Sequence, residues 1–122
     1  MVHSNAADLL PWRAHVAAIA MSQCPKEWDT TGPMFVRASF YLPRPKNHYR
    51  ANGELKDAAP WWCAKKPDTD KLCRSLLDAL TDAGVWADDS QAVQLNADKT
   101  YTDTGPGGLW CIVQHLTERN NG

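Results

Sequence analysis

Two groups of carboxylates at the two ends of one predicted helix are the residues of this chain best suited to chemistry. Asp68 and Asp70 lie at the start of the helix, and Asp88 and Asp89 follow its end after a short turn. Magnesium prefers oxygen ligands and takes one or two carboxylates, while water and substrate phosphate complete its coordination. Carboxylates beside basic side chains therefore indicate a site that holds Mg²⁺ against a phosphate. The basic side chains that flank the first group are Lys65, Lys66 and Lys71.

Each group of acids also has a simpler explanation. An Asp near a helix start is more often an N-terminal cap than a metal ligand, so one of Asp68 and Asp70 can serve only as a cap. Asp88 and Asp89 can equally belong to a solvated turn. The two groups carry more weight together, because the helix returns the chain so that a strand after Asp89 can run beside the helix start.

The helix between the acids is the clearest element of the sequence and is predicted over residues 69–83. Gly84 is a natural C-terminal cap. Arg74 lies four residues from both Asp70 and Asp78 and can reach either acid on that face. The opposite face carries an apolar stripe at helical spacing, which predicts packing against a core. That stripe consists of Leu72, Leu76, Leu80 and Ala83.

The remaining elements predict a small α+β domain that occupies residues 1–122. A helix is expected over residues 6–23, and a strand over residues 34–42 is followed by a long irregular loop over residues 43–67. Two further strands, near residues 92–101 and 109–116, are joined by a glycine-rich segment that predicts an antiparallel hairpin. We therefore expect two main helices packed with a small mixed or antiparallel sheet.

Composition excludes several classes of protein. Hydrophobic residues make up 43% of the 122 residues and charged residues 22%, which predicts a globular domain rather than disorder. No apolar run reaches the ~18 residues needed to span a membrane. The stretch from Val16 to Met21 is short and precedes Cys24-Pro25-Lys26-Glu27 rather than a cleavage site, so we do not interpret it as a signal peptide.

The cysteines and histidines give no sign of a zinc site. Four cysteines are present without a CxxC pair, which disfavours a zinc ribbon and a disulfide framework. We expect free thiols in a reducing compartment, the cytoplasm. The cysteines are Cys24, Cys63, Cys73 and Cys111, and the scattered histidines are His3, His15, His48 and His115.

Charge is balanced overall but placed unevenly. The net charge is −1 and the pI is about 6.4, which is not the overall signature of a nucleic-acid-binding protein. The segment from Arg37 to Arg50 nevertheless contains basic residues and no acid. A metal site beside a basic surface would produce this total, since the two contributions cancel.

The long loop combines basic and aromatic residues, which favours a binding role. Its cations are expected to bind DNA phosphates flanking the site, and Tyr49, Trp61 or Trp62 are candidates to stack on unpaired bases. The alternative for these aromatic residues is core packing, and we prefer it for the two tryptophans. The candidate phosphate-binding residues are Arg44, Lys46, His48, Arg50, Lys65 and Lys66.

The acid-bearing segment matches a known family. The stretches that carry the match are Asp68-Thr69-Asp70-Lys71-Leu72, Leu77-Asp78-Ala79-Leu80-Thr81, Ala83-Gly84-Val85-Trp86 and Asp88-Asp89-Ser90-Gln91-Ala92-Val93. They resemble the RusA family of Holliday-junction resolvases, whose pattern is D-x-D-N-x-x-K, then D-A-L, then G-x-x-x-D-D-x-Q-V. The match is ungapped from Asp68 to Val93, whereas residues 6–42 and 92–116 agree only in the order of their elements.

The resemblance implies a homodimeric, Mg²⁺-dependent endonuclease that resolves four-way DNA junctions by paired symmetric nicks, in recombination and repair. Asp68, Asp70 and Asp89 match the metal-binding acids of the family, and Asp88 is the adjacent acid. Arg74 stands where the family usually has its catalytic lysine, and Lys71 replaces the usual asparagine. Whether Arg74 or a nearby lysine contacts the scissile phosphate is left open by these departures.

A further departure concerns the beginning of the chain. Family members usually start with a strand and a proline-rich loop, whereas this chain starts almost at the first helix, so one strand is expected to be missing. A branched-DNA-binding protein with weak or no cleavage is therefore the alternative function. A nucleotide phosphohydrolase is less well supported, because the only glycine-rich segment, 105–108, precedes a strand rather than a helix.

The 44–67 loop is similar to that of phage-encoded members, which implies a bacterial cytoplasmic protein from a phage or prophage.

Overall fold

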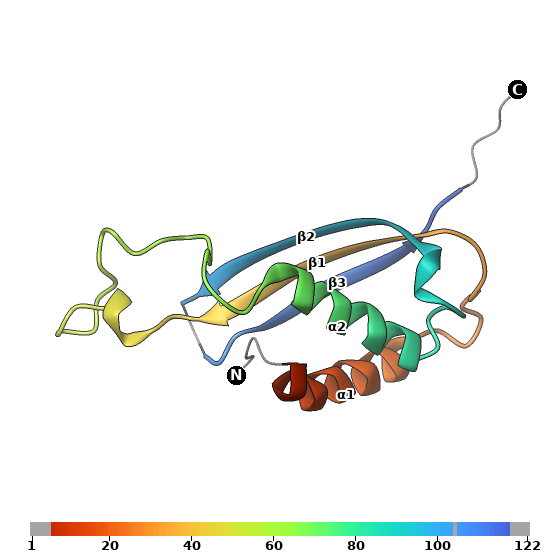
Figure 1. Cartoon of the computed structure of the whole chain (residues 1–122), viewed down its shortest axis with the longest axis horizontal. Helices are drawn as coiled ribbons and strands as arrows, with labels where there is room; N and C mark the ends of the chain where they lie inside the picture. The colour runs from red at the N-terminus through yellow and green to blue at the C-terminus, as the bar shows by residue number, and fades with distance from the viewer. Residues whose placement is uncertain (1–5, 104, 118–122) are drawn as a thin grey trace, which may run out of the picture.

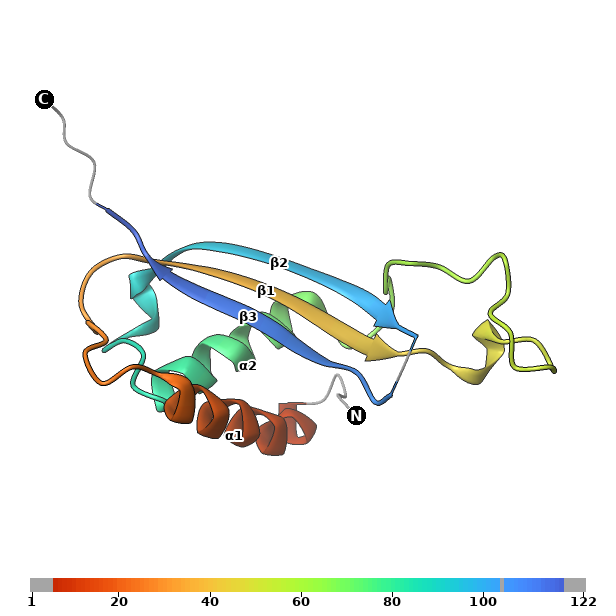
Figure 2. The same cartoon turned by 180° about the vertical axis from the view of Figure 1, so that it is seen from behind.

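A three-stranded sheet covered on one face by two helices forms the molecule (Figure 1, Figure 2). The computed structural model describes residues 6–103 and 105–117. The predicted α+β class, with two main helices and a small mixed sheet, is confirmed. The elements in chain order are α1 (Ala6–Gln23), β1 (Met34–Pro43), the 3-10 turn η1 (Lys46–His48), α2 (Thr69–Asp82), the 3-10 turn η2 (Asp89–Gln91), β2 (Ala92–Thr102) and β3 (Gly108–His115).

The strand order is β2-β1-β3, with β1 at the centre. β1 runs parallel to β2, from Met34 opposite Ala92 to Pro43 opposite Thr102. It runs antiparallel to β3, where Met34 lies opposite His115. The prediction of a hairpin between β2 and β3 was wrong, because β1 lies between them. β1 is the most thoroughly buried strand. Its buried backbone N–H and C=O groups need hydrogen-bonding partners, and the central position provides a strand on both sides.

The glycine-rich segment after β2 is a crossover connection rather than a hairpin turn. It carries the chain from β2 past the end of β1 to β3. Gly107 has φ +91°, and a Cβ at this position would lie 2.2 Å from the carbonyl oxygen of Tyr41. Only glycine permits both this backbone conformation and such a close approach to another backbone segment. The glycines are therefore needed, but they allow two chain segments to cross closely and do not form a hairpin turn.

Replacing Gly107 by Ala tests this contact. We expect the Gly107→Ala variant to lose about 2 kcal/mol of unfolding free energy, because the new methyl group meets backbone and the residue is held at positive φ. Gly108→Ala is the matched control, since a Cβ there has nothing within 4 Å. Urea unfolding of the two variants gives the comparison, and equal stabilities would contradict the close crossing.

The core lies between the sheet and the two helices. Alternate residues of β1 point into it, and Met34 and Val36 are completely buried. From α2, Leu72 and Leu76 are also completely buried, which confirms the predicted apolar stripe. Gly84 ends the helix as predicted, with φ +79° and its N–H donating to the carbonyl oxygen of Thr81 over 3.0 Å.

An ion pair at the surface joins the two helices. The guanidinium of Arg13 in α1 makes two hydrogen bonds to the carboxylate of Asp82, at 2.7 and 3.0 Å, and lies 3.7 Å from Asp78. Asp78 therefore faces α1 and pairs with Arg13, although the four-residue spacing had also made Arg74 a candidate partner. This orientation leaves Arg74 on the other side of α2.

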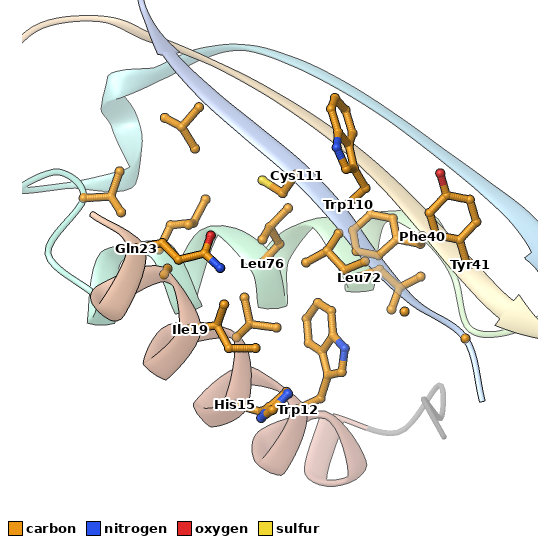
Figure 3. Close-up of a pocket in the computed structure, with 18 of the residues that line it drawn as sticks. Trp12, His15, Ile19, Gln23, Phe40, Tyr41, Leu72, Leu76, Trp110 and Cys111 are labelled. Carbon is orange, nitrogen blue, oxygen red and sulfur yellow. The ribbon is translucent and has the colours of Figure 1, made fainter. Parts of the chain in front are cut away.

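An apolar groove runs between α1 and β3 (Figure 3). Its volume is about 810 Å³, and its walls include Trp12 and Ile19 from α1 and Trp110 from β3. Among the residues that the structure describes, no strand pairs with the outer edge of β3. Ile19 and Trp110 consequently remain exposed along an open edge.

The four cysteines are free, as expected from their spacing. Cys63 and Cys73 are buried, and Cys24 and Cys111 are half-buried. Burial raises the pKa of the Cys111 thiol to about 11, so this group stays protonated at neutral pH. In the described part of the chain, no helix is long and apolar enough to cross a membrane.

Candidate active site and nucleic-acid interface

One acid from each predicted group lines a shared hollow on the exposed side of α2. Asp70 and Arg74 are four residues apart in α2 and therefore lie on one face of the helix. Asp89 begins η2, which leads directly into β2, and its side chain closes the hollow from that side. The volume is about 340 Å³, and the remaining walls are Cys73, Leu77 and Leu95.

The other two acids are engaged elsewhere. Asp68 occupies the N-cap position of α2, and its carboxylate lies 3.8 Å from Nζ of Lys71. Asp88 is the N-cap of η2, where its side chain accepts hydrogen bonds from the Ser90 hydroxyl and from the backbone N–H of Gln91. The bond from Ser90 is the main cause that lowers the pKa of Asp88. Neither Asp68 nor Asp88 lines the hollow.

The donor set of the hollow suits a cation that needs few protein ligands. Within the described residues, no three His, Cys, Asp or Glu side chains come together in a way that could hold a metal ion. Asp70 and Asp89 supply two carboxylates, which is what Mg²⁺ usually takes from a protein while keeping water and phosphate oxygens as further ligands. A structural zinc site, with four nitrogen or sulfur ligands, does not fit these residues.

The charged side chains of the hollow are surrounded partly by apolar side chains. Cys73 is buried, and its thiol pKa is raised first by burial and second by the negative charge of Asp70. Arg74 is exposed and forms no ion pair with any residue that the structure describes. The guanidinium is thus placed beside two carboxylates and open to solvent, where it can donate hydrogen bonds to a phosphate.

Arg44 has a different position from the other predicted phosphate-binding residues. Its side chain is only 3% exposed, and its Nε donates to Asp103 over 2.9 Å. Its Nη1 donates to the carbonyl oxygen of Pro60 over 2.7 Å, and the guanidinium lies over the ring of Tyr101. The guanidinium is therefore already used to hold the start of the loop to Pro60 and to the end of β2.

His48 belongs to the same anchor and does not provide a positive charge. Its Nδ1 lies 3.3 Å from Nη1 of Arg44, and its ring packs edge-on against Tyr101. Burial, followed by the charge of Arg44, lowers the pKa of His48 from its usual 6.5. The imidazole is consequently neutral at pH 7, which removes it from the set of cations available to phosphates.

The exposed cations of the loop are lysines and one arginine. Arg50 pairs with Asp57 over 3.2 Å at the surface, where the ion pair is weak and Arg50 can exchange partners. These residues have the exposure that phosphate binding requires. They are Lys46, Arg50, Lys65 and Lys66 from the predicted set, together with Lys56.

The tryptophans of the loop correct our expectation from the sequence. We expected core packing for Trp61 and Trp62, but they are 62% and 60% exposed. The residue that follows them, Cys63, is buried. Core packing at this point therefore comes from a small side chain and leaves both indoles at the surface.

Lys99 is a positioning residue that the sequence analysis missed. From β2, its Nζ donates to the carbonyl oxygens of Lys65 and Pro67, over 2.5 and 2.6 Å. These bonds fix the segment that leads into Asp68. The available signal was the alternation of β2, because Lys99 lies opposite Phe40 on the core-facing side, where a lysine needs hydrogen-bond partners.

Replacing Arg44 tests the anchoring role. We expect Arg44→Ala to raise the rate of protease cleavage within residues 44–66 roughly tenfold, because the loss of charge-assisted hydrogen bonds releases the loop. Lys46→Ala is the control, since Lys46 is exposed. Limited proteolysis with mass spectrometry measures both variants. Equal protection of this segment in Arg44→Ala and the parent would argue against the anchor.

Comparison with models of known families shows the family to which this chain belongs. The family model described as endodeoxyribonuclease RusA matches residues 5–108. The chain belongs to the RusA endodeoxyribonuclease family. It is therefore an endodeoxyribonuclease, a hydrolase of DNA phosphodiesters, and the family function implies Holliday junctions as substrate. A search of curated proteins found no significant match.

The family relationship agrees with the resemblance carried by residues 68–93, and the match extends well beyond that segment on its N-terminal side. RusA resolvases generally need a divalent metal ion, and the pair of carboxylates in the hollow is compatible with one. The match includes α1, β1, the long loop, α2 and β2, so it covers both the hollow and the loop that lies beside it.

Proposed function

We propose that this protein is a Mg²⁺-dependent, structure-specific endodeoxyribonuclease that resolves Holliday junctions by paired symmetric nicks during DNA recombination and repair in the bacterial cytoplasm. The observation that carries the proposal is the meeting of Asp70, Arg74 and Asp89 in one hollow of a RusA-family chain. The presence of two carboxylates and a guanidinium supports hydrolysis of a phosphodiester, because the reaction needs both a cation site and a phosphate contact.

The residues of the hollow have separate tasks in this reaction. Asp70 and Asp89 would hold the metal ion, and Asp68 would join them only by leaving its ion pair with Lys71. When bound, Mg²⁺ activates water as a nucleophile and neutralises charge on the phosphate. Arg74 donates hydrogen bonds to the phosphate but cannot accept a proton, because a guanidinium remains charged at any physiological pH. Lys71 can supply a mobile ammonium to the same phosphate or to its neighbour.

The exposed cations of the loop extend the contact along the DNA. Lys46, Arg50, Lys65 and Lys66 would bind phosphates that flank the cut, which gives an affinity that falls as salt concentration rises. Arg44 contributes by keeping the loop in place. The pair of nicks needs two active sites related by two-fold symmetry, and a homodimer provides them because a four-way junction is itself nearly two-fold symmetric.

A branched-DNA-binding protein that cuts poorly is the second candidate. The separation of the four acids favours it, since Asp88 is used in a cap and Asp68 pairs with Lys71. The same basic loop would serve this function. The two candidates differ in cleavage and agree in binding.

A synthetic mobile four-way junction tests the proposed activity. We expect the purified protein to introduce paired nicks into the junction when Mg²⁺ is present, to bind it without cutting in EDTA, and to leave linear duplex of the same sequence intact. Denaturing gels of strands labelled one at a time measure the nicks. Binding without cutting in Mg²⁺ would favour the second candidate, and failure of a folded protein to do either would reject both.

Single substitutions test which carboxylates hold the metal ion. We expect Asp70→Asn to lower junction cleavage at least about 100-fold while binding stays within about threefold of the parent, because a metal ligand is lost but the cationic loop is intact. Asp78→Asn is the matched control on the same helix, since Asp78 faces Arg13. Near-parental cleavage by Asp70→Asn would remove this residue from the site.

Asp88 and Asp89 provide a further internal comparison in the same assay. Asp89→Asn is expected to lower cleavage as Asp70→Asn does, because both side chains line the hollow. Asp88→Asn should have a smaller effect, since an asparagine can still cap η2. The reverse order would assign the metal site to Asp88.

A further inference from the structure

The two tryptophans of the loop are unusual because they are both exposed and held firmly. Trp61 and Trp62 are 62% and 60% exposed, whereas Trp86 is buried in the core. An exposed pair of indoles gives up the free energy that burial provides, so its presence at a surface indicates contact with something else.

The backbone of these residues is fixed by the sheet. The N–H of Tyr101 donates to the carbonyl oxygen of Trp61 over 3.2 Å, and the N–H of Cys63 donates to that of Lys99 over 3.0 Å. Trp62 thus lies opposite Thr100 in an isolated antiparallel bridge to β2. Little backbone freedom remains to be lost when the indoles bind, which favours affinity.

The anchor at Arg44 holds the same segment from its other end. The Arg44 guanidinium binds the carbonyl oxygen of Pro60, the residue immediately before the tryptophans. Trp62 forms the bridge to Thr100, and Trp61 lies in a bend immediately before it, so the two exposed indoles leave the backbone at adjacent positions. We call this adjacent pair of exposed indoles the wedge.

The charges around the wedge indicate a nucleic acid as its partner. The loop over residues 44–66 contains six Lys or Arg residues and two acids, Glu54 and Asp57. Lys65 and Lys66 follow the tryptophans and are exposed. Exposed aromatic rings next to ammonium groups match unstacked bases next to phosphates, since every base offers a ring face whatever its sequence.

The wedge lies on the segment that leads to the catalytic hollow. After Lys66 the chain reaches Asp68 through the short stretch that Lys99 holds against β2. Figure 1 shows residues 43–68 projecting past the end of the sheet where β1 and β2 end, and then returning to the start of α2. A base held by the wedge would therefore lie on DNA that continues toward α2.

We propose that Trp61 and Trp62 form a stacking wedge that binds unstacked bases at the centre of a branched DNA and so selects junctions over linear duplex. This inference rests on the proposed function and assigns its branch recognition to two residues. A linear duplex keeps its bases stacked, so the wedge gains nothing there. A branch point interrupts stacking and offers base faces to both indoles.

The test compares binding of the full chain to a four-way junction and to linear duplex, in EDTA so that cleavage does not intervene. Trp61→Ala/Trp62→Ala should weaken junction binding by about tenfold or more per indole, while duplex binding changes less than threefold. Trp61→Phe/Trp62→Phe should retain most of the preference, because phenyl rings still stack. Trp110→Ala is the matched control, since Trp110 is an exposed indole 49% accessible on β3, away from β2.

A second measurement locates the contact directly. A junction with 5-iododeoxyuridine at the branch point, irradiated in complex with the parent protein, should form a cross-link to the peptide that contains Trp61 and Trp62. Circular dichroism and thermal unfolding confirm that each variant is folded. A cross-link confined to another segment, or unchanged junction preference in the double alanine variant, would overturn the wedge.

The two proposals fail in distinguishable ways. If the parent protein cuts junctions but the double alanine variant keeps its preference for them, the wedge is wrong and the resolvase function stands. If the parent neither binds nor cuts a junction, the function is wrong and the wedge falls with it.

Discussion

The pairing of β1 with a strand on each side is the constraint on which the rest of the structure depends. Its inner face is buried against both helices, and its two edges fix the directions of β2 and β3. Because β2 is parallel to β1, the chain must return from the end of β1 to the beginning of β2, and α2 makes that return. The position of Asp70 on α2 and of Asp89 just before β2 follows from this connection.

The long loop shows how cations bound to backbone carbonyl oxygens give a surface segment a defined shape. Arg44 and Lys99 both use their charges on backbone carbonyl oxygens, of Pro60 in one case and of Lys65 and Pro67 in the other. Arg44 also pairs with the carboxylate of Asp103. The lysines at the surface are then left available for a ligand, and the segment between the two anchors carries Trp61 and Trp62 in a fixed position.

Local sequence patterns predicted the helices correctly. The wrong predictions concerned pairing between segments that are far apart in the chain. The stripe from Leu72 to Leu80 and the cap at Gly84 are properties of neighbouring residues, so α2 could be placed to within a residue at its C-terminal end. The glycine-rich segment before β3 has the composition of a turn, but its partner is the backbone of Tyr41, far away in the chain. Residue type alone likewise predicted burial for Trp61 and exposure for Arg44, and both assignments were reversed by contacts across the loop.

The strand order also determines when the protein can fold during its synthesis. β1 is complete at Pro43, but its parallel partner ends at Thr102 and its antiparallel partner at His115. Neither edge of β1 can be paired until β2 or β3 has left the ribosome, so an apolar strand stays unpaired while residues 44–91 are synthesised. The helices α1 and α2 can form earlier from local contacts, and their apolar faces are the nearest cover for that strand. Completion of the fold therefore waits until β3 has emerged and closes the sheet.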